Sequence, residues 1–96
     1  MRPSEALSLH RAQIRTIALS HHASNVRVFG STVHGEDHEG SDLDLLVDPT
    51  TETSLMDIGA IRHELKVLLG MEVDVITPAG LPIGIRERVM KEALPI

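Results

Sequence analysis

The 96-residue sequence contains no cysteine, no tryptophan, no tyrosine and a single phenylalanine, Phe29. The lack of cysteine excludes disulfides and thiolate metal sites. With one aromatic residue of this set, the chain has no stacking platform for single-stranded nucleic acid, and its core must be aliphatic. It also lacks an apolar run long enough to span a membrane and an N-terminal segment resembling a signal peptide, so we expect a cytoplasmic protein.

Basic charge is scarce as well. Nine lysines and arginines stand against 14 aspartates and glutamates, which gives a net charge of −5. This balance argues against direct nucleic-acid binding and against an anionic membrane surface. It suits a metal site or a basic protein partner, and it equally suits a surface whose acidity only maintains solubility. The length predicts one domain, residues 1–96, and the hydrophobic fraction of 42% is sufficient for a packed core.

The hydrophobic pattern predicts a small two-layer α/β fold with a short three-stranded sheet covered by helices. The predicted strands are residues 26–29, 43–47 and 72–77, and the predicted helices are residues 4–22, 54–69 and 81–93. Ser4 is expected to cap the first helix, and Ser54 with Asp57 to form a capping box for the second. Gly70 is expected to end the second helix, and Pro82 to lie in the first turn of the third. Residues 31–40 are predicted to form a loop.

Two carboxylates, Asp42 and Asp44, form the most informative pattern in the chain. Because residues two apart in a strand point to the same face, these side chains would project together. Such a pair repels unless a metal ion or a proton neutralises it. Gly30 and Ser31 stand just before them at the end of an apolar run, where backbone N–H groups and a hydroxyl can cradle phosphates. The combination predicts Mg²⁺-dependent phosphate chemistry.

Asp74 supplies a third carboxylate within an apolar strand, between Val73 and Val75. Charged residues rarely occupy such positions unless they are paired, bound to metal or exposed at a strand edge. If the third strand lies beside the second, Asp42, Asp44 and Asp74 converge. Three carboxylates and the phosphates of a nucleotide form the usual clamp for two metal ions.

This series (Gly30-Ser31, then Asp42-Leu43-Asp44, then Asp74) resembles the pattern of the DNA polymerase β-like nucleotidyltransferase superfamily. The short length is similar to that of the minimal nucleotidyltransferases, the MNT antitoxins of HEPN/MNT toxin–antitoxin systems. The resemblance implies a small nucleotidyltransferase fold with a mixed sheet. It also implies transfer of AMP from ATP, with two Mg²⁺ ions or Mn²⁺, to a hydroxyl of a HEPN ribonuclease toxin, typically a tyrosine, and complex formation with that toxin.

The resemblance also assigns roles to the five motif residues. Gly30 and Ser31 would hold the phosphates of the nucleotide. Asp42 and Asp44 would bind metal. Asp74 would bind the catalytic metal and assist deprotonation of the acceptor hydroxyl.

The chain departs from the family pattern directly after the Gly-Ser pair. Many members continue with Arg-x-Arg-Gly, whereas residues 32–35 here read Thr-Val-His-Gly. A neutral side chain cannot grip phosphate as a guanidinium does. Arg27, Arg62 or an arginine of a partner are candidates for the missing cation.

Two alternatives therefore stay open. One is a catalytically weak antitoxin that acts by complex formation only. The other is a nucleotidyltransferase that modifies a small molecule, as antibiotic-modifying members do, although the chain has little material for a separate acceptor domain.

His34 and His38 stand four residues apart, but we interpret them as part of a solvated polar loop rather than a metal site.

Overall fold

A computed structural model describes all 96 residues and contains one mixed sheet with the strand order β3-β2-β1-β4. The strands are β1 (Ala23–Phe29), β2 (Leu43–Pro49), β3 (Val73–Ile76) and β4 (Leu94–Pro95). β1 pairs antiparallel with both β2 and β4, whereas β2 and β3 run parallel. The parallel pair requires a crossover connection, which α2 (Leu55–Leu69) provides.

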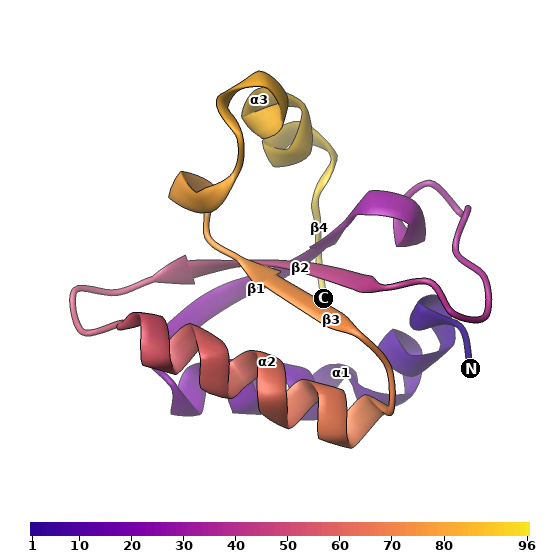
Figure 1. Cartoon of the computed structure of the whole chain (residues 1–96), viewed down its shortest axis with the longest axis horizontal. Helices are drawn as coiled ribbons and strands as arrows, with labels where there is room; N and C mark the ends of the chain where they lie inside the picture. The colour runs from indigo at the N-terminus through magenta and orange to yellow at the C-terminus, as the bar shows by residue number, and fades with distance from the viewer.

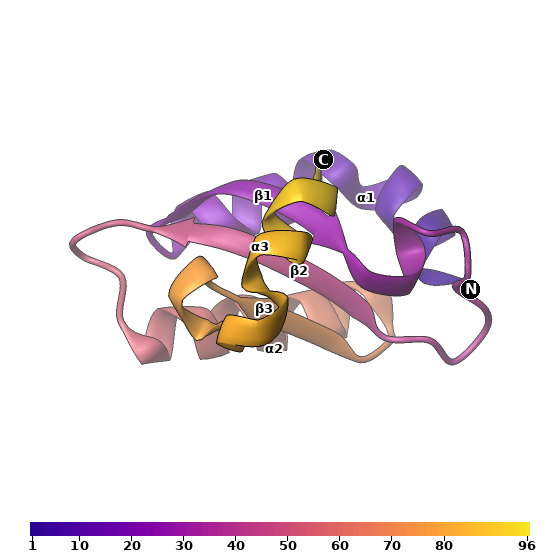
Figure 2. The ribbon, with the colours of Figure 1, turned by 90° about the horizontal axis from the view of Figure 1, so that it is seen from above.

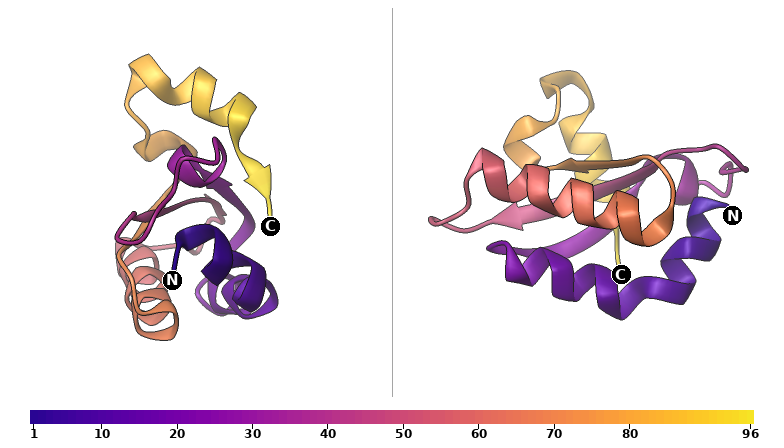
Figure 3. Two further views of the ribbon diagram at one scale, coloured as in Figure 1. Left: turned by 90° about the vertical axis from the view of Figure 1, so that its right-hand side faces the viewer. Right: turned by 60° about the horizontal axis from the view of Figure 1, so that its bottom comes forward.

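The helices are divided between the two faces of the sheet. α1 (Pro3–Ser20) and α2 lie side by side on one face, and α3 (Ile83–Glu92) lies on the other (Figures 1 and 3). Seen from above, α3 crosses the strands rather than following them (Figure 2). Two 3₁₀ turns, η1 (Gly30–Thr32) and η2 (Pro78–Gly80), follow β1 and β3. The predicted small α/β class is confirmed, but the expected two layers are three, because α3 covers the second face of the sheet.

The main core lies between the sheet and the α1–α2 layer. Leu43, Leu45 and Val47 alternate along β2 with no exposed surface, and they pack with Ile61 and Leu65 of α2 in a cluster of 15 buried residues. Burying one such side chain stabilises the fold by about 1.5–3 kcal/mol. This alternation fixes which face of β2 is turned to the core, and therefore which face carries Asp44.

The predicted ends of α2 are confirmed. Ser54 caps the helix and forms a capping box with Asp57, whose backbone N–H donates to Ser54 Oγ over 3.1 Å. Gly70 ends the helix with a φ of 67°, a left-handed conformation that favours glycine.

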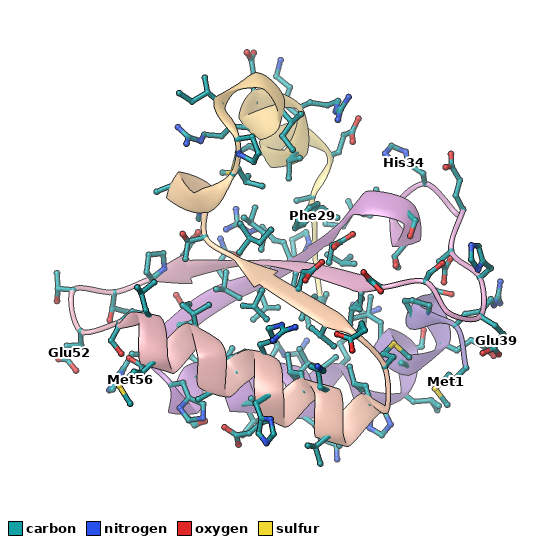
Figure 4. All side chains as sticks on the ribbon, in the orientation of Figure 1. Met1, Phe29, His34, Glu39, Glu52 and Met56 are labelled. Atoms are coloured by element: carbon teal, nitrogen blue, oxygen red, sulfur yellow. The ribbon has the colours of Figure 1, made fainter.

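A smaller cluster holds α3 on the opposite face. Phe29, Leu46, Leu81 and Val89 are buried together there, and Phe29 lies between the sheet and α3 (Figure 4). The single phenylalanine of the chain thus fills the space between β1 and α3.

The expected three-stranded sheet is wrong by one strand. β4 adds Leu94 and Pro95 at the edge of the sheet, opposite Val28 and Arg27. A two-residue strand that contains proline has no alternating pattern, and proline is tolerated only because this strand lies at an edge. The sequence therefore carried no signal for it.

The beginning of the chain also differs from the prediction. Ser4 does not cap α1, because the helix begins at Pro3 with Arg2 at the cap position. Instead, the Ser4 backbone N–H donates to Asp37 Oδ2 over 2.9 Å, so a distant carboxylate satisfies this free donor.

The first strand also begins earlier than predicted. Asn25 does not precede the strand but lies within β1 at a bulge, with a φ of 49°.

Two apolar residues within the predicted helices 54–69 and 81–93 do not belong to the core. Leu55, at the start of α2, is 91% exposed, and Ile83, at the start of α3, is 85% exposed. Pro82 precedes α3 as its cap residue rather than lying in the first turn. Leu55 and Ile83 each lie at the first position of their helix, and helical spacing alone does not show whether a side chain there packs against the sheet. No helix is both long and apolar enough to cross a membrane.

Asp37 is predicted to stabilise the start of α1. The Ser4 N–H bonded to its carboxylate holds the pKa of Asp37 below its ordinary value of 3.8. Its contribution is therefore present above pH 3.8 and is lost as the pH falls through the lower folded-state value. We expect Asp37→Ala to reduce the free energy of unfolding at pH 7 by about 1 kcal/mol.

Urea denaturation at pH 7 measures this loss. Glu36→Ala is the matched control, because Glu36 is an exposed neighbour whose side chain forms no hydrogen bond. Equal stability of the two variants would contradict a capping role for Asp37.

Candidate active site

The predicted site residues meet where β1 ends and where β2 and β3 begin. Asp44 lies directly opposite Asp74 in the parallel register and opposite Phe29 in the antiparallel register. Gly30 follows Phe29, and Asp42 comes two residues before Asp44. The order of β3, β2 and β1, which the sequence left undetermined, thus gathers Gly30, Asp44 and Asp74.

Gly30 approaches the Asp44 side chain so closely that any added Cβ atom would force the carboxylate to move. A Cβ atom on Gly30 would overlap Asp44 Oδ2 and lie 3.3 Å from Asp44 Cγ. Gly30 also has a φ of 77°, which L side chains rarely adopt. Steric contact and backbone conformation both require glycine here, and the contact joins the Gly-Ser turn to the carboxylates.

The carboxylates act on one another electrostatically. Partial burial raises the pKa of Asp44 to about 6, with further contributions from the Asp74 charge, a hydrogen bond with Asp74 and the Asp42 charge. Asp42 and Asp74 are themselves exposed. Asp44 is therefore the half-buried centre of the group, with an exposed acid on either side.

The donor set fits a hard divalent cation. No three His, Asp or Glu side chains are grouped tightly enough to enclose an ion by themselves. Carboxylate oxygens are nevertheless the ligands that Mg²⁺ prefers, and Mg²⁺ is commonly held by one or two carboxylates together with substrate phosphates. Burial, and then the neighbouring carboxylates, raise the pKa of Asp44, and a bound cation would favour the charged form that they disfavour.

A cavity of about 480 Å³ opens beside the Gly-Ser turn, between η1 and α3. Its lining consists of Phe29, Gly30, Ser31, His34, Glu36, Ile85, Arg88, Val89 and Glu92. A volume of this size is typical of small-molecule sites. The three aspartates do not line the cavity, but Gly30 and Ser31 do, and Gly30 also touches Asp44. The turn is therefore the boundary between the cavity and the acids.

The loop after β1 is joined to α3 across this cavity. His34 Nε2 lies 3.0 Å from Glu92 Oε2, and Figure 4 shows His34 on the loop, on the same side of the sheet as α3. His38 lies apart from this pair, with its Nδ1 2.7 Å from the Glu39 carbonyl. The two histidines share no site, in agreement with the interpretation of a polar loop.

Neither arginine suggested by the sequence reaches the cavity. Arg27 is paired with Asp48 towards the far end of β2. Arg62 donates from Nε to the Val73 carbonyl over 3.2 Å. The arginine that does line the cavity is Arg88, on α3. Sequence reasoning missed it, and its only signal was helical spacing with Ile85, Val89 and Glu92.

Comparisons with known proteins agree with this arrangement. The sequence profile of the nucleotidyltransferase domain family matches residues 11–96. The chain belongs to this family. The resemblance to the minimal nucleotidyltransferases is confirmed as well, since a solved structure described as a candidate minimal nucleotidyltransferase is 40% identical, with a TM-score of 0.86 and coverage of 97% of this chain and 95% of its own.

Two archaeal relatives of this nucleotidyltransferase carry more detailed names. The candidate protein adenylyltransferase MJ0435 of Methanocaldococcus jannaschii is 34% identical over 90% of this chain and 92% of its own length. The protein adenylyltransferase MntA of Thermococcus cleftensis is 39% identical over 72% of this chain and 70% of its own length.

A toxin–antitoxin complex crystallised with AMP-PNP contains a chain of the same fold. This chain has a TM-score of 0.74 and 17% identity, with coverage of 88% of this nucleotidyltransferase and 69% of its own length. At this identity the likeness concerns the fold. The individual roles of Gly30, Ser31, Asp42, Asp44 and Asp74 in the nucleotidyltransferase remain predictions, which the following variants test.

Gly30→Ala is expected to displace the Asp44 carboxylate. The added methyl group occupies the space of Asp44 Oδ2, and alanine is strained at a φ of 77°. We expect a loss of about 1–3 kcal/mol in the free energy of unfolding and loss of nucleotidyl transfer. Urea denaturation and a transfer assay measure the two effects.

Gly35→Ala is the matched control, because Gly35 has a similar φ of 69° but no atom within 4 Å of an added Cβ. It carries the same backbone strain without the overlap, so transfer should persist. If Gly30→Ala and Gly35→Ala behaved alike, the contact with Asp44 would be irrelevant.

Asp44→Asn is expected to stabilise the metal-free nucleotidyltransferase above pH 6. The pKa of Asp44 is raised from 3.8 to about 6 in the folded state, so the folded protein binds the proton more tightly than the unfolded chain. Wild type therefore loses stability as the pH rises from about 4 to about 6, and the deficit is constant above that range. The variant should gain on the order of 1 kcal/mol at pH 7 after allowance for solvent screening, and little at pH 4.

Thermal unfolding in EDTA at several pH values measures this difference. Asp48→Asn is the control of opposite sign, because it removes the partner of Arg27 and should lower stability at pH 7. Addition of Mg²⁺ should raise the Tm of wild type above pH 6 and leave that of Asp44→Asn nearly unchanged. A destabilised Asp44→Asn at pH 7 without metal would show that Asp44 is not under electrostatic repulsion.

Proposed function

We propose that this nucleotidyltransferase is an antitoxin that transfers AMP from ATP to a hydroxyl, typically of a tyrosine, on a cognate HEPN ribonuclease toxin, and that also binds this toxin. The observation that carries the proposal is the position of Asp44, which touches Gly30 on one side and lies opposite Asp74 on the other. The names of the archaeal relatives and the fold shared with a toxin–antitoxin chain support it.

Two of the motif residues would bind the substrate, and the other three would bind metal ions. Gly30 and Ser31 hold the phosphates of ATP through the turn that lines the cavity. Asp42, Asp44 and Asp74 hold two Mg²⁺ ions, or Mn²⁺ in their place. When bound, these ions neutralise the triphosphate and lower the pKa of the attacking hydroxyl.

The reaction is a substitution at the α-phosphorus of ATP. The acceptor oxygen forms a bond to this phosphorus, and the bond from phosphorus to the oxygen bridging the α- and β-phosphates breaks. Pyrophosphate leaves with the electron pair of that bond. The acceptor loses its hydroxyl proton, and the exposed Asp74 carboxylate, which faces the incoming acceptor, assists this loss. Positioning and charge stabilisation supply most of the catalysis in such transfers.

The exposure of the acids favours a macromolecular acceptor. Asp42 and Asp74 lie open to solvent rather than within the cavity, so the acceptor side of the site is accessible to the surface of another protein. We place the reaction in the cytoplasm, where ATP and the RNA targets of a ribonuclease are found.

A catalytically weak antitoxin that acts by binding alone is the second candidate. The observation that favours it lies directly after Ser31, where the Thr32 hydroxyl is buried without a hydrogen-bond partner and His34 is paired with Glu92. Neither residue offers a free positive charge to phosphate. Binding alone predicts a stable complex with the toxin that carries no AMP.

Intact mass spectrometry of the toxin after co-expression tests the proposal. We expect an increase of one or more AMP units with wild type and none with Asp42→Asn/Asp44→Asn, because the double variant lacks two of the three metal-binding carboxylates. Glu52→Gln is the control, since it removes an exposed charge beyond the other end of β2 and should leave labelling intact. A stable complex without any AMP increment in the presence of ATP would favour the binding-only antitoxin.

A further inference from the structure

The cavity beside the Gly-Ser turn contains one side chain with a permanent positive charge, that of Arg88. The other ionisable residues in its lining are His34, Glu36 and Glu92. A nucleoside triphosphate is strongly anionic, and this chain has a net charge of −5. A triphosphate held at Gly30 and Ser31 would therefore meet two glutamates and a single arginine.

Most other cations of the chain are already engaged. Five of them form ion pairs with a carboxylate: Arg2 with Glu5, Arg27 with Asp48, Arg62 and Lys66 with Glu72, and Lys91 with Glu87. A sixth, Arg86, donates hydrogen bonds to the carbonyls of Ala79 and Leu81. The remaining three, Arg11, Arg15 and Arg88, form no hydrogen bond or ion pair through their side chains. Arg11 and Arg15 belong to α1, on the opposite face of the sheet (Figure 1). Arg88 is thus the one unengaged cation on the cavity side.

The packing of α3 explains why Arg88 is free and why it borders the cavity. Ile85, Arg88, Val89 and Glu92 recur at helical spacing, so they share the face of α3 that borders the cavity. Glu92 lies one turn beyond Arg88 and would be its natural partner within the helix. Glu92 is instead paired with His34 across the cavity, which leaves the guanidinium of Arg88 without a carboxylate.

We propose that Arg88 binds the phosphate groups of the nucleoside triphosphate held at Gly30 and Ser31. A guanidinium presents paired N–H donors that match two phosphate oxygens, and it remains charged at every pH at which the protein folds. Arg88 would therefore set the affinity for the phosphate chain and not for the base. The proposal rests on the nucleotide-dependent function proposed above and adds a substrate-binding residue from α3.

Calorimetric titration of the 96-residue chain with the Mg²⁺ complex of AMP-PNP tests this role. We expect Arg88→Ala to weaken binding by about tenfold or more, and Arg88→Lys to restore part of the affinity, because lysine keeps the charge but loses the paired donors. Arg88 is exposed and unpaired, so both variants should fold, and an unchanged Tm verifies this.

Lys91→Ala is the matched control, since it removes a positive charge from the same helix at a position that does not line the cavity. It should change the affinity by no more than about twofold. Adenosine provides the second comparison, because it lacks phosphates and its affinity should not change in Arg88→Ala. Equal effects of Arg88→Ala and Lys91→Ala, or an equal loss for adenosine, would overturn the assignment.

Transfer kinetics separate this proposal from the proposed function. If wild type labels the toxin, Arg88→Ala should raise the KM for ATP with a smaller change in kcat, and an unchanged KM would refute the role of Arg88 alone. If wild type binds the nucleotide as described but labels no toxin, the proposed transfer of AMP fails while the role of Arg88 stands. If wild type binds no nucleotide, both are refuted.

Discussion

The position of Asp44 between two strands is the constraint on which the rest of the site depends. On one side the backbone of Gly30 leaves no room for a Cβ atom, and on the other side Asp74 lies directly across the parallel register. Asp44 is also half-buried, which disfavours its charged form. The fold therefore holds a carboxylate where its charge is unfavourable, as functional sites commonly do at the expense of stability.

The core on the opposite face of the sheet maintains this position. Leu43 and Leu45, the neighbours of Asp44 in β2, are fully buried against the α1–α2 layer. A shift of β2 by one residue would move both leucines out of this core and turn Asp44 into it. Each buried side chain stabilises the fold by about 1.5–3 kcal/mol, so several of them outweigh the repulsion among the carboxylates. The apolar face of β2 thus enforces the geometry of its acidic face.

Local sequence patterns predicted many features of this molecule. The arrangement of segments that are distant in the sequence was predicted less well. The alternation around Asp42, Asp44 and Asp74 and the caps of α2 are visible in short stretches of sequence, and the structure places Asp44 directly opposite Asp74. The four-stranded sheet depends on β4, whose two residues carry no pattern. The position of Arg88 at the cavity could not be predicted from the sequence either. It depends on how α3 packs against Phe29, and helical periodicity does not specify that packing. The exposure of Leu55 at the first position of α2 was likewise not predicted, since residue spacing does not show which side chains of a helix pack against the sheet.

The attachment of α3 divides the molecule into parts of unequal local stability. The wall of the cavity is held by four buried side chains and by the two residues of β4, whereas the main core contains 15 buried residues. Segments with few buried contacts open with a lower free energy than the whole domain. We therefore expect the wall formed by α3 to open with a lower free energy than β1, β2 and β3, which keep the carboxylates in register. A nucleotide held in the cavity, as proposed above, would then exchange without global unfolding of the domain.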